Sequence, residues 1–166
     1  MKKVLPKIIL CIVLVCVLFT VFDNIGVSAD NLEKDIRSSQ SINEDWTVDG
    51  KVGNTMAAFI SYPKNNSDHT FSVYVKHSGI SFGYFFRAGG GVGEIDDGIA
   101  CFVVSECDER AFISMNKQKA VKLTTAGEEI ELDSEKPFAI VVPVNAGDVT
   151  FYDVEGNTVE YYERSM

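Results

Sequence analysis

The sequence has few of the residues that most often build catalytic and metal sites. Its two histidines, His69 and His77, lie eight residues apart, which is about 26 Å along an extended strand, so we do not expect them to share a metal. Neither Ser78 nor Ser81 nearby has the glycines of a nucleophile elbow around it. These absences leave no recognisable nucleophile and base.

Positive charge and helical periodicity are also scarce. The chain has 15 Lys and Arg against 24 Asp and Glu, a net charge of −9, which disfavours nucleic acid and anionic membrane surfaces as partners. No segment after residue 45 repeats apolar side chains every 3.6 residues, so the main part of the chain is not expected to be helical.

The N-terminus has the layout of a bacterial-type signal peptide. Lys2, Lys3 and Lys7 precede an apolar run from Ile8 to Phe22, which would rise only about 22 Å as a helix and is short for a hydrocarbon core of about 30 Å. Val27-Ser28-Ala29 offers the small residues of a cleavage site. We therefore expect a signal peptide over residues 1–29, cleaved after Ala29, and a secreted or cell-surface protein. The alternative is that the segment stays uncleaved as a membrane anchor.

Lipid attachment is not expected at the cysteines of this segment. Leu10 precedes Cys11 and Val15 precedes Cys16, and both are bulkier than the small residue that normally precedes an acylated cysteine.

Removal of residues 1–29 would leave 137 residues and a net charge of −11, because the segment carries three lysines and one aspartate. That length suits one domain. Residues 30–45 are polar, with Leu32, Ile36 and Ile42 as their large apolar residues, and predict an N-terminal tether or a marginal helix. We expect the single domain over residues 46–166.

Short apolar runs separated by turn residues follow from Trp46 onward, and several alternate strictly between apolar and polar residues. Such alternation predicts strands with one buried face. The run 138–142 is apolar throughout, which predicts a strand covered on both faces in the middle of a sheet, and residues 149–161 predict a C-terminal hairpin. The pattern favours an all-β fold, a β-sandwich of about nine or ten short antiparallel strands, with a barrel as the alternative. The expected strands include 55–62, 70–77, 81–87, 99–105 and 111–115.

A glycine-rich stretch, residues 88–98, contains Glu94, Asp96 and Asp97. Acidic residues rather than a lysine follow its glycines, so it would repel a phosphate. The acids could ligate Ca²⁺, but their spacing is not that of an EF-hand. We expect a solvated loop, with a metal site at these three residues as a weak alternative.

Aromatic residues are the weak candidates for ligand binding. Phe82, Tyr84 and Phe86 alternate along one expected strand, so they would share a face, either stacked on a sugar or buried between sheets. Burial is the more economical use. Trp46, the only tryptophan, is expected to be partly exposed at the edge of the ordered part.

Two cysteines, Cys101 and Cys107, lie after residue 29. On one extended strand they would be about 20 Å apart, too far to bridge, so they could pair only if the chain turned between them. Because residues 99–104 predict a strand and 106–110 a turn, we favour two unbridged thiols.

Together these features predict an exported module that works by binding, without catalysis and without a cofactor. The strongly acidic chain favours a protein partner at or outside the cell surface. A carbohydrate-binding module that uses exposed aromatics is the alternative, and a small secreted hydrolase built on acidic residues is the second alternative.

Overall fold

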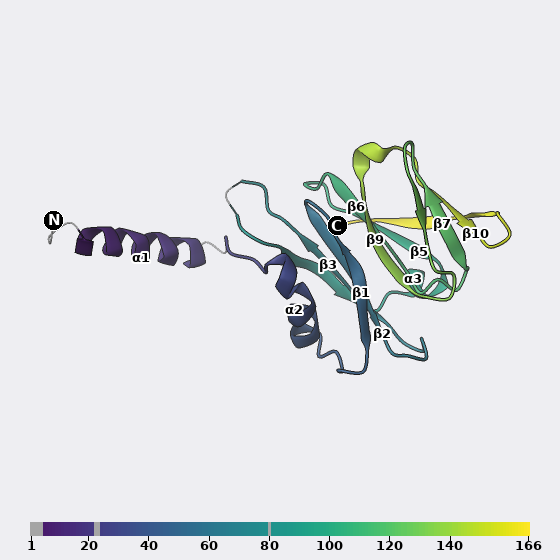
Figure 1. The fold of residues 1–166 in the computed structure, drawn as a ribbon, viewed down its shortest axis with the longest axis horizontal. Coiled ribbons are helices and arrows are strands. Elements are labelled where there is room, and N and C mark those ends of the chain that lie inside the picture. Colours follow the sequence, from purple (N-terminus) through teal and green to yellow (C-terminus); the bar gives the residue numbers. More distant parts are fainter. Residues whose placement is uncertain (1–4, 22–23, 80) are drawn as a thin grey trace.

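The computed structural model describes residues 5–21, 24–79 and 81–166 (Figure 1). Its helices are α1 (Leu5–Val21), α2 (Leu32–Ser39) and α3 (Gly93–Asp97), with 3₁₀ turns at Ala29–Asn31 and Val144–Ala146. Its strands are β1 (Thr47–Val52), β2 (Met56–Tyr62), β3 (Thr70–Val75), β4 (Phe85–Gly90), β5 (Ile99–Val103), β6 (Glu109–Ser114), β7 (Ala120–Thr124), β8 (Glu129–Glu131), β9 (Phe138–Pro143), β10 (Thr150–Asp153), β11 (Thr158–Val159) and β12 (Tyr161–Ser165).

The strands form three open sheets of four strands each. Sheet I has the order β1-β2-β3-β4, sheet II the order β12-β5-β6-β9, and sheet III the order β11-β10-β7-β8. All neighbours pair antiparallel except β12, which runs parallel to β5. The all-β sandwich expected from the sequence is confirmed, with twelve strands rather than nine or ten and with one parallel pair.

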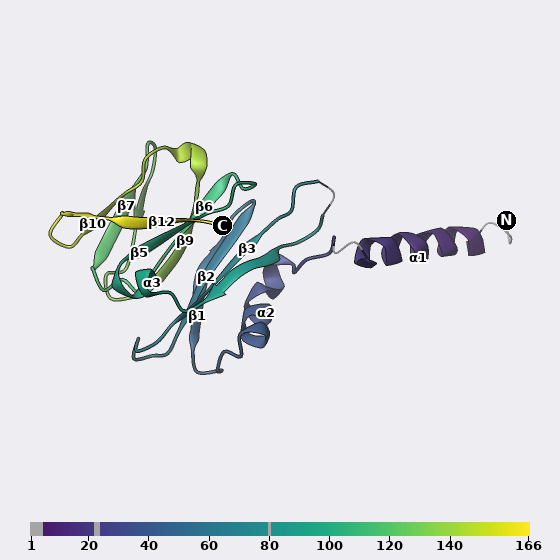
Figure 2. The same cartoon turned by 180° about the vertical axis from the view of Figure 1, so that it is seen from behind.

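The sheets stack in layers, with α2 on the outer face of sheet I and sheet II in the middle (Figures 1 and 2). Period-two alternation explains this arrangement, because successive side chains of a strand enter opposite cores. Phe102 and Ile113 of sheet II pack toward sheet I, whereas Cys101 and Phe112, their chain neighbours, pack toward sheet III. Sheet II is therefore covered on both faces.

The apolar run 138–142 is covered on both faces, as expected, but it is not in the middle of a sheet. It forms β9, which among the described strands pairs with β6 alone and is an edge strand of sheet II. Its coverage comes from the layers on either side, because Ala139 packs toward sheet I while Phe138 and Val142 pack toward sheet III. A continuous apolar run indicates that both faces of a strand are buried. It does not indicate whether both edges of the strand are hydrogen-bonded to neighbours.

The expected strand 81–87 begins later than the alternation indicated. Gly83 has a φ of +83°, a conformation that breaks an extended strand, and β4 begins at Phe85. The expected C-terminal hairpin is present as β10 and β11, but the chain then leaves it at Tyr161 and joins sheet II as β12.

Residues 32–39 form α2. Of the two alternatives for the polar segment, a tether or a marginal helix, the structure therefore contains the helix. Leu32 and Ile36, one turn apart, are fully buried and pack on Ala57 and Tyr74 of sheet I. The Tyr74 hydroxyl donates to the Asp35 carboxylate at 2.7 Å, and burial together with that carboxylate raises the pKa of Tyr74. The helix is thus attached to the sheet by both apolar and polar contacts.

Helix α1 projects away from the sheets at the N-terminal end of the chain (Figure 2). Over residues 5–21, 24–79 and 81–166, none of the helices has the length and apolar character needed to span a membrane.

Candidate functional site

The candidate aromatics do not form one continuous row. Phe82 and Phe86 are exposed, by 61% and 53%, whereas Tyr84 between them is 5% exposed. The Tyr84 ring belongs to the core beneath α2, and its hydroxyl donates to the Gly53 carbonyl at 2.6 Å. Phe86 lies edge-on to the Tyr74 ring, with 5.6 Å between ring centroids. Tyr84 is therefore not part of an exposed aromatic row.

Trp46 is half-buried, as expected for the edge of the ordered part. It directly precedes β1, at the opposite edge of sheet I from β4, which carries Phe86. The structure therefore does not bring the tryptophan together with the other aromatic candidates.

The acidic stretch is the short helix α3 rather than a loop, and two of its three carboxylates, those of Glu94 and Asp96, are paired with cations. Glu94 accepts from Arg164, and Asp96 lies 2.8 Å from the Lys117 ammonium. Each partner lowers the pKa of its carboxyl group. In the described part of the chain no group of three or more His, Cys, Asp or Glu side chains is arranged to hold a metal.

Cys101 and Cys107 are both buried and unbridged, as the sequence predicted. They lie in different cores, Cys101 between sheets II and III and Cys107 between sheets I and II. Burial raises the pKa of Cys101 to about 12 and also raises that of Cys107, so both remain thiols at neutral pH. Neither has the electropositive, accessible surroundings of a reactive cysteine.

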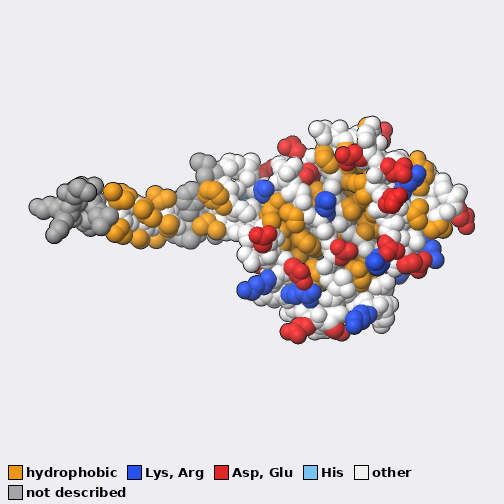
Figure 3. Space-filling view, viewed as in Figure 1, with side chains coloured by type: hydrophobic (Ala, Val, Ile, Leu, Met, Phe, Trp, Pro, Cys, Tyr) orange, Lys and Arg blue, Asp and Glu red, His pale blue; other side chains and the backbone are white. Residues whose placement is uncertain are grey.

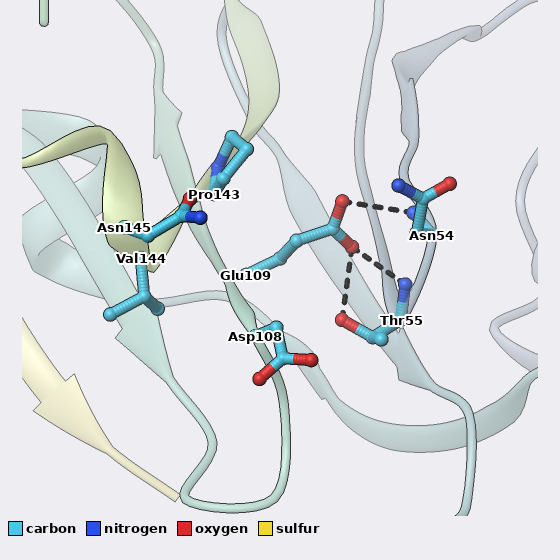
Figure 4. Close-up of a pocket in the computed structure, with 7 residues that line it drawn as sticks. All are labelled: Asn54, Thr55, Asp108, Glu109, Pro143, Val144 and Asn145. Atoms are coloured by element: carbon cyan, nitrogen blue, oxygen red, sulfur yellow. Dashed lines mark hydrogen bonds between the residues drawn. The ribbon is translucent and has the colours of Figure 1, made fainter.

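The most developed polar cluster is one that the sequence did not single out. The Glu109 carboxylate, at the start of β6, accepts backbone N–H groups from Asn54, Thr55 and Met56 at 2.9, 2.7 and 2.9 Å. It also accepts the Thr55 hydroxyl at 3.1 Å. Figure 4 shows the carboxylate pointing into the turn between β1 and β2. The turn forms a ring of donors that the protein's own anion fills.

Opposing effects act on the ionisation of Glu109, which is 6% exposed. Burial raises the pKa of its carboxyl group, but the backbone and hydroxyl donors of the turn lower it more, so that the net pKa lies below the ordinary glutamate value. The group is therefore ionised at neutral pH and all its hydrogen bonds go to the turn. This carboxylate attaches sheet I to sheet II and is not available as a general acid.

A cavity of about 510 Å³ opens beside this carboxylate. Asn54, Thr55, Asp108 and Glu109 line one side, and Pro143, Val144 and Asn145 line the other (Figure 4). A second cavity of about 500 Å³ shares Pro143 and Asn145 with the first and continues along β9. The two cavities form a groove, named the β9 groove here, along the free edge of sheet II.

The walls of the β9 groove come from the edge strands of the other two sheets. Lys51 of β1 lies on one side, and Glu128 and Ile130 of the β7–β8 hairpin lie on the other. Val141 and Val142 of β9 also line it. Since β1, β8 and β9 are all edge strands, the stacking of three open sheets produces this groove.

One signal in the sequence could have found Glu109. It precedes Ala111, Ile113 and Met115 in the same alternation, and this face is the buried one, so the pattern already placed a carboxylate inside. The groove itself had no such signal, because it depends on which strands are at edges.

No family model, curated protein or solved structure matches this chain.

Proposed function

We propose that this protein is an exported, non-catalytic binding module that takes up an extended segment of another protein as an additional strand on β9. Its partner would lie at or outside the cell surface. The observation that carries the proposal is the free edge of β9 in a groove between β1 and β8. Strand addition to an exposed sheet edge is a common mode of peptide recognition.

The phase of the β6–β9 pairing determines which backbone groups of β9 face the groove. The Val144 N–H donates to the Asp108 carbonyl at 2.8 Å, and alternation along the antiparallel ladder makes Val142 and Ile140 the next residues bonded to β6. The N–H and C=O of Val141 consequently point to the free edge. A partner strand would find a donor and an acceptor there.

Proline limits the length of this edge. Pro143, the last residue of β9, has no N–H and cannot extend the ladder. Short edges that end at proline are a common protection against open-ended aggregation. The edge therefore favours one short segment rather than continuous stacking of copies.

The charges around the groove favour a basic segment. Asp108 and Glu128 are exposed at its two ends, against one exposed lysine, Lys51, and the whole chain has a net charge of −9. In an added strand, alternate side chains would point to opposite faces of sheet II, one set toward β1 and the other toward Glu128 and Ile130 of the β7–β8 hairpin. A segment that alternates small apolar residues with Lys or Arg fits both surfaces.

A synthetic peptide of alternating lysine and valine is the probe for this proposal. We expect it to bind the full chain, to slow hydrogen exchange at the Val141 amide, and to weaken as salt is raised. The same peptide N-methylated at alternate residues cannot pair with β9 and should not bind. Equal binding of both peptides would contradict strand addition.

Val141→Pro removes the N–H at the free edge and should abolish binding of the lysine–valine peptide. Val154→Pro is the matched control, because Val154 is 59% exposed and lies in the turn closed by the Gly156 N–H to Asp153 carbonyl bond, where proline is tolerated. Loss of binding in both variants, or in neither, would argue against the β9 edge.

A glycan remains the second candidate, favoured by the exposed rings of Phe82 and Phe86. Stacking on a sugar predicts binding that is insensitive to salt and lost in Phe86→Ala. A screen of immobilised glycans at low and high salt separates this candidate from a basic peptide.

A further inference from the structure

The segment that precedes the expected cleavage site is hydrogen-bonded into the folded domain. Gly26 N–H donates to the Phe82 carbonyl at 2.7 Å, and Phe82 N–H donates to the Asn24 carbonyl at 3.0 Å. Val27 and Tyr84 exchange N–H to C=O bonds of 2.8 and 2.7 Å in both directions. Residues 24–27 thus form β-bridges with the chain that leads into β4.

Two glycines allow this close backbone approach. A Cβ on Gly26 would lie 2.5 Å from the Tyr84 carbonyl oxygen, and a Cβ on Gly83 would lie 2.6 Å from the Val27 carbonyl oxygen. Gly83 also has a φ of +83°, which side chains other than glycine seldom adopt. The contact requires a glycine on each side.

The chain remains attached to the domain beyond this bridge. Val27 packs against the core beneath α2. The Asn31 side chain then donates to the Ser28 hydroxyl at 2.7 Å, and Asn31 N–H donates to the Ser28 carbonyl at 2.9 Å. Leu32, the first residue of α2, is fully buried. The expected site at Val27-Ser28-Ala29 therefore lies between two docked segments.

From these contacts we infer that the protein keeps residues 24–29, and with them α1, which attaches the domain to a lipid bilayer. Proteolysis is governed by the burial and hydrogen bonding of the affected backbone, and a peptidase must take up the residues before the cut as an accessible extended segment. Here those residues are bonded to Phe82 and Tyr84. Cleavage after Ala29 would remove the four backbone hydrogen bonds to Phe82 and Tyr84, the Val27 contact and the bonds of Asn31 to Ser28 from the fold.

The exposed surface of α1 is apolar, which favours lipid as its environment. Between residues 8 and 18 its large apolar side chains are exposed by between 46% at Leu18 and 68% at Leu10, and Figure 3 shows hydrophobic side chains along this stretch. The sequence of the helix contains no acidic residue. A helix that is apolar all round belongs in an apolar environment. Its 17 residues rise about 25 Å, less than a hydrocarbon core about 30 Å thick, so α1 can lie within the apolar part of a bilayer without crossing it.

Basic residues at the start of α1 also favour a location at a lipid bilayer. Lys7 lies in its first turn, and Lys2 and Lys3 precede it in the sequence. Lysines next to an apolar segment are attracted to anionic headgroups. The acidic domain itself would be repelled by such a surface, so α1 would hold the domain beside the bilayer without the domain lying on it.

The test is the intact mass and the membrane association of the full chain, expressed in a bacterial host with a C-terminal tag. We expect the mass to include residues 24–29 and α1. We also expect the purified chain to float with vesicles of phosphatidylcholine and phosphatidylglycerol, and to resist washing with high salt. A chain that begins at Asp30, or an uncut chain that does not float, would overturn the inference.

A glycine variant tests whether docking protects the site. Gly83→Ala lies outside the residues that a signal peptidase reads and should raise the fraction cut after Ala29 several-fold. Gly93→Ala is the control, since its added Cβ would meet nothing within 4 Å. Should Gly83→Ala unfold the domain, the intact mass and the vesicle flotation of the parent chain still decide the inference. An unchanged cut fraction in a folded variant would show that the bridge does not protect this site.

Discussion

The carboxylate of Glu109 accepts the backbone N–H of Thr55 at 2.7 Å, although the two residues are 54 positions apart in the chain. This bond and its neighbours connect the β1–β2 turn of sheet I to β6 of sheet II. The connection is made at the mouth of the β9 groove, so the shape of the groove and the stability of the sandwich depend on the same side chain.

Glu109→Gln should lower the free energy of unfolding by about 2 kcal/mol, because charge-assisted hydrogen bonds become neutral ones and the amide brings donors toward a turn made of donors. Urea unfolding monitored by circular dichroism measures the change. Glu106→Gln, at an exposed position, is the control and should stay within about 0.5 kcal/mol of the parent.

The same carboxylate predicts a dependence of stability on pH. The pKa of Glu109 is lower in the folded protein than the ordinary value of 4.5. Its ionised carboxylate therefore contributes fully to the free energy of unfolding above pH 4.5, and this contribution is lost as the pH falls through the folded pKa. Unfolding measured between pH 3 and 7 should show an acid loss in the parent that is smaller in Glu109→Gln. If the free energies of unfolding of the parent and of Glu109→Gln fell equally with pH, Glu109 would not be the group responsible for the acid loss.

Ile36→Ala should destabilise the domain by about 2 to 4 kcal/mol, since it leaves a cavity beneath α2 where Ile36 is fully buried. Lys34→Ala, on the exposed side of the same helix, should change stability little. If both variants unfolded with the parent's midpoint, α2 would not be docked on sheet I in solution.

Phe112→Ala tests the core between sheets II and III. Phe112 is fully buried, and its ring lies edge-on to Phe151 and to Tyr161, with 5.2 Å between centroids in each pair, so we expect a loss of about 3 to 5 kcal/mol. Phe86→Ala, at a half-exposed ring, should cost about 1 kcal/mol or less. Thermal unfolding of the two variants side by side makes the comparison.

The thiols of Cys101 and Cys107 should resist alkylation in the folded protein at neutral pH, because burial raises the pKa of both groups. In denaturant without reductant both should be modified, as mass spectrometry of the peptides would show. An unmodified pair under those conditions would mean that a disulfide joins them, and the unbridged assignment would then be wrong.

Local pattern was sufficient for much of the fold. Apolar and polar residues alternate in segments such as 70–75 and 120–124, and both segments form strands as predicted. The single buried face expected for 70–75 is wrong, because α2 covers Tyr74 and β3 is buried on both faces. The run from Ile99 predicted β5, and the turn after it kept Cys101 and Cys107 in separate cores. Alternation failed at Phe82 and Tyr84, where the positive φ of Gly83 interrupts the strand.

By itself the sequence determined the class of fold, the apolar N-terminal segment, the acidic charge and the two separate thiols, since each follows from composition or from spacing of a few residues. Only the tertiary structure decided which strands are edges, that Glu109 fills the β1–β2 turn, and that residues 24–27 bond to residues 82–84. These features join segments distant in the chain, and which distant backbone groups meet depends on how whole sheets stack and pair. The β9 groove and the docking of the N-terminal segment are both products of that stacking.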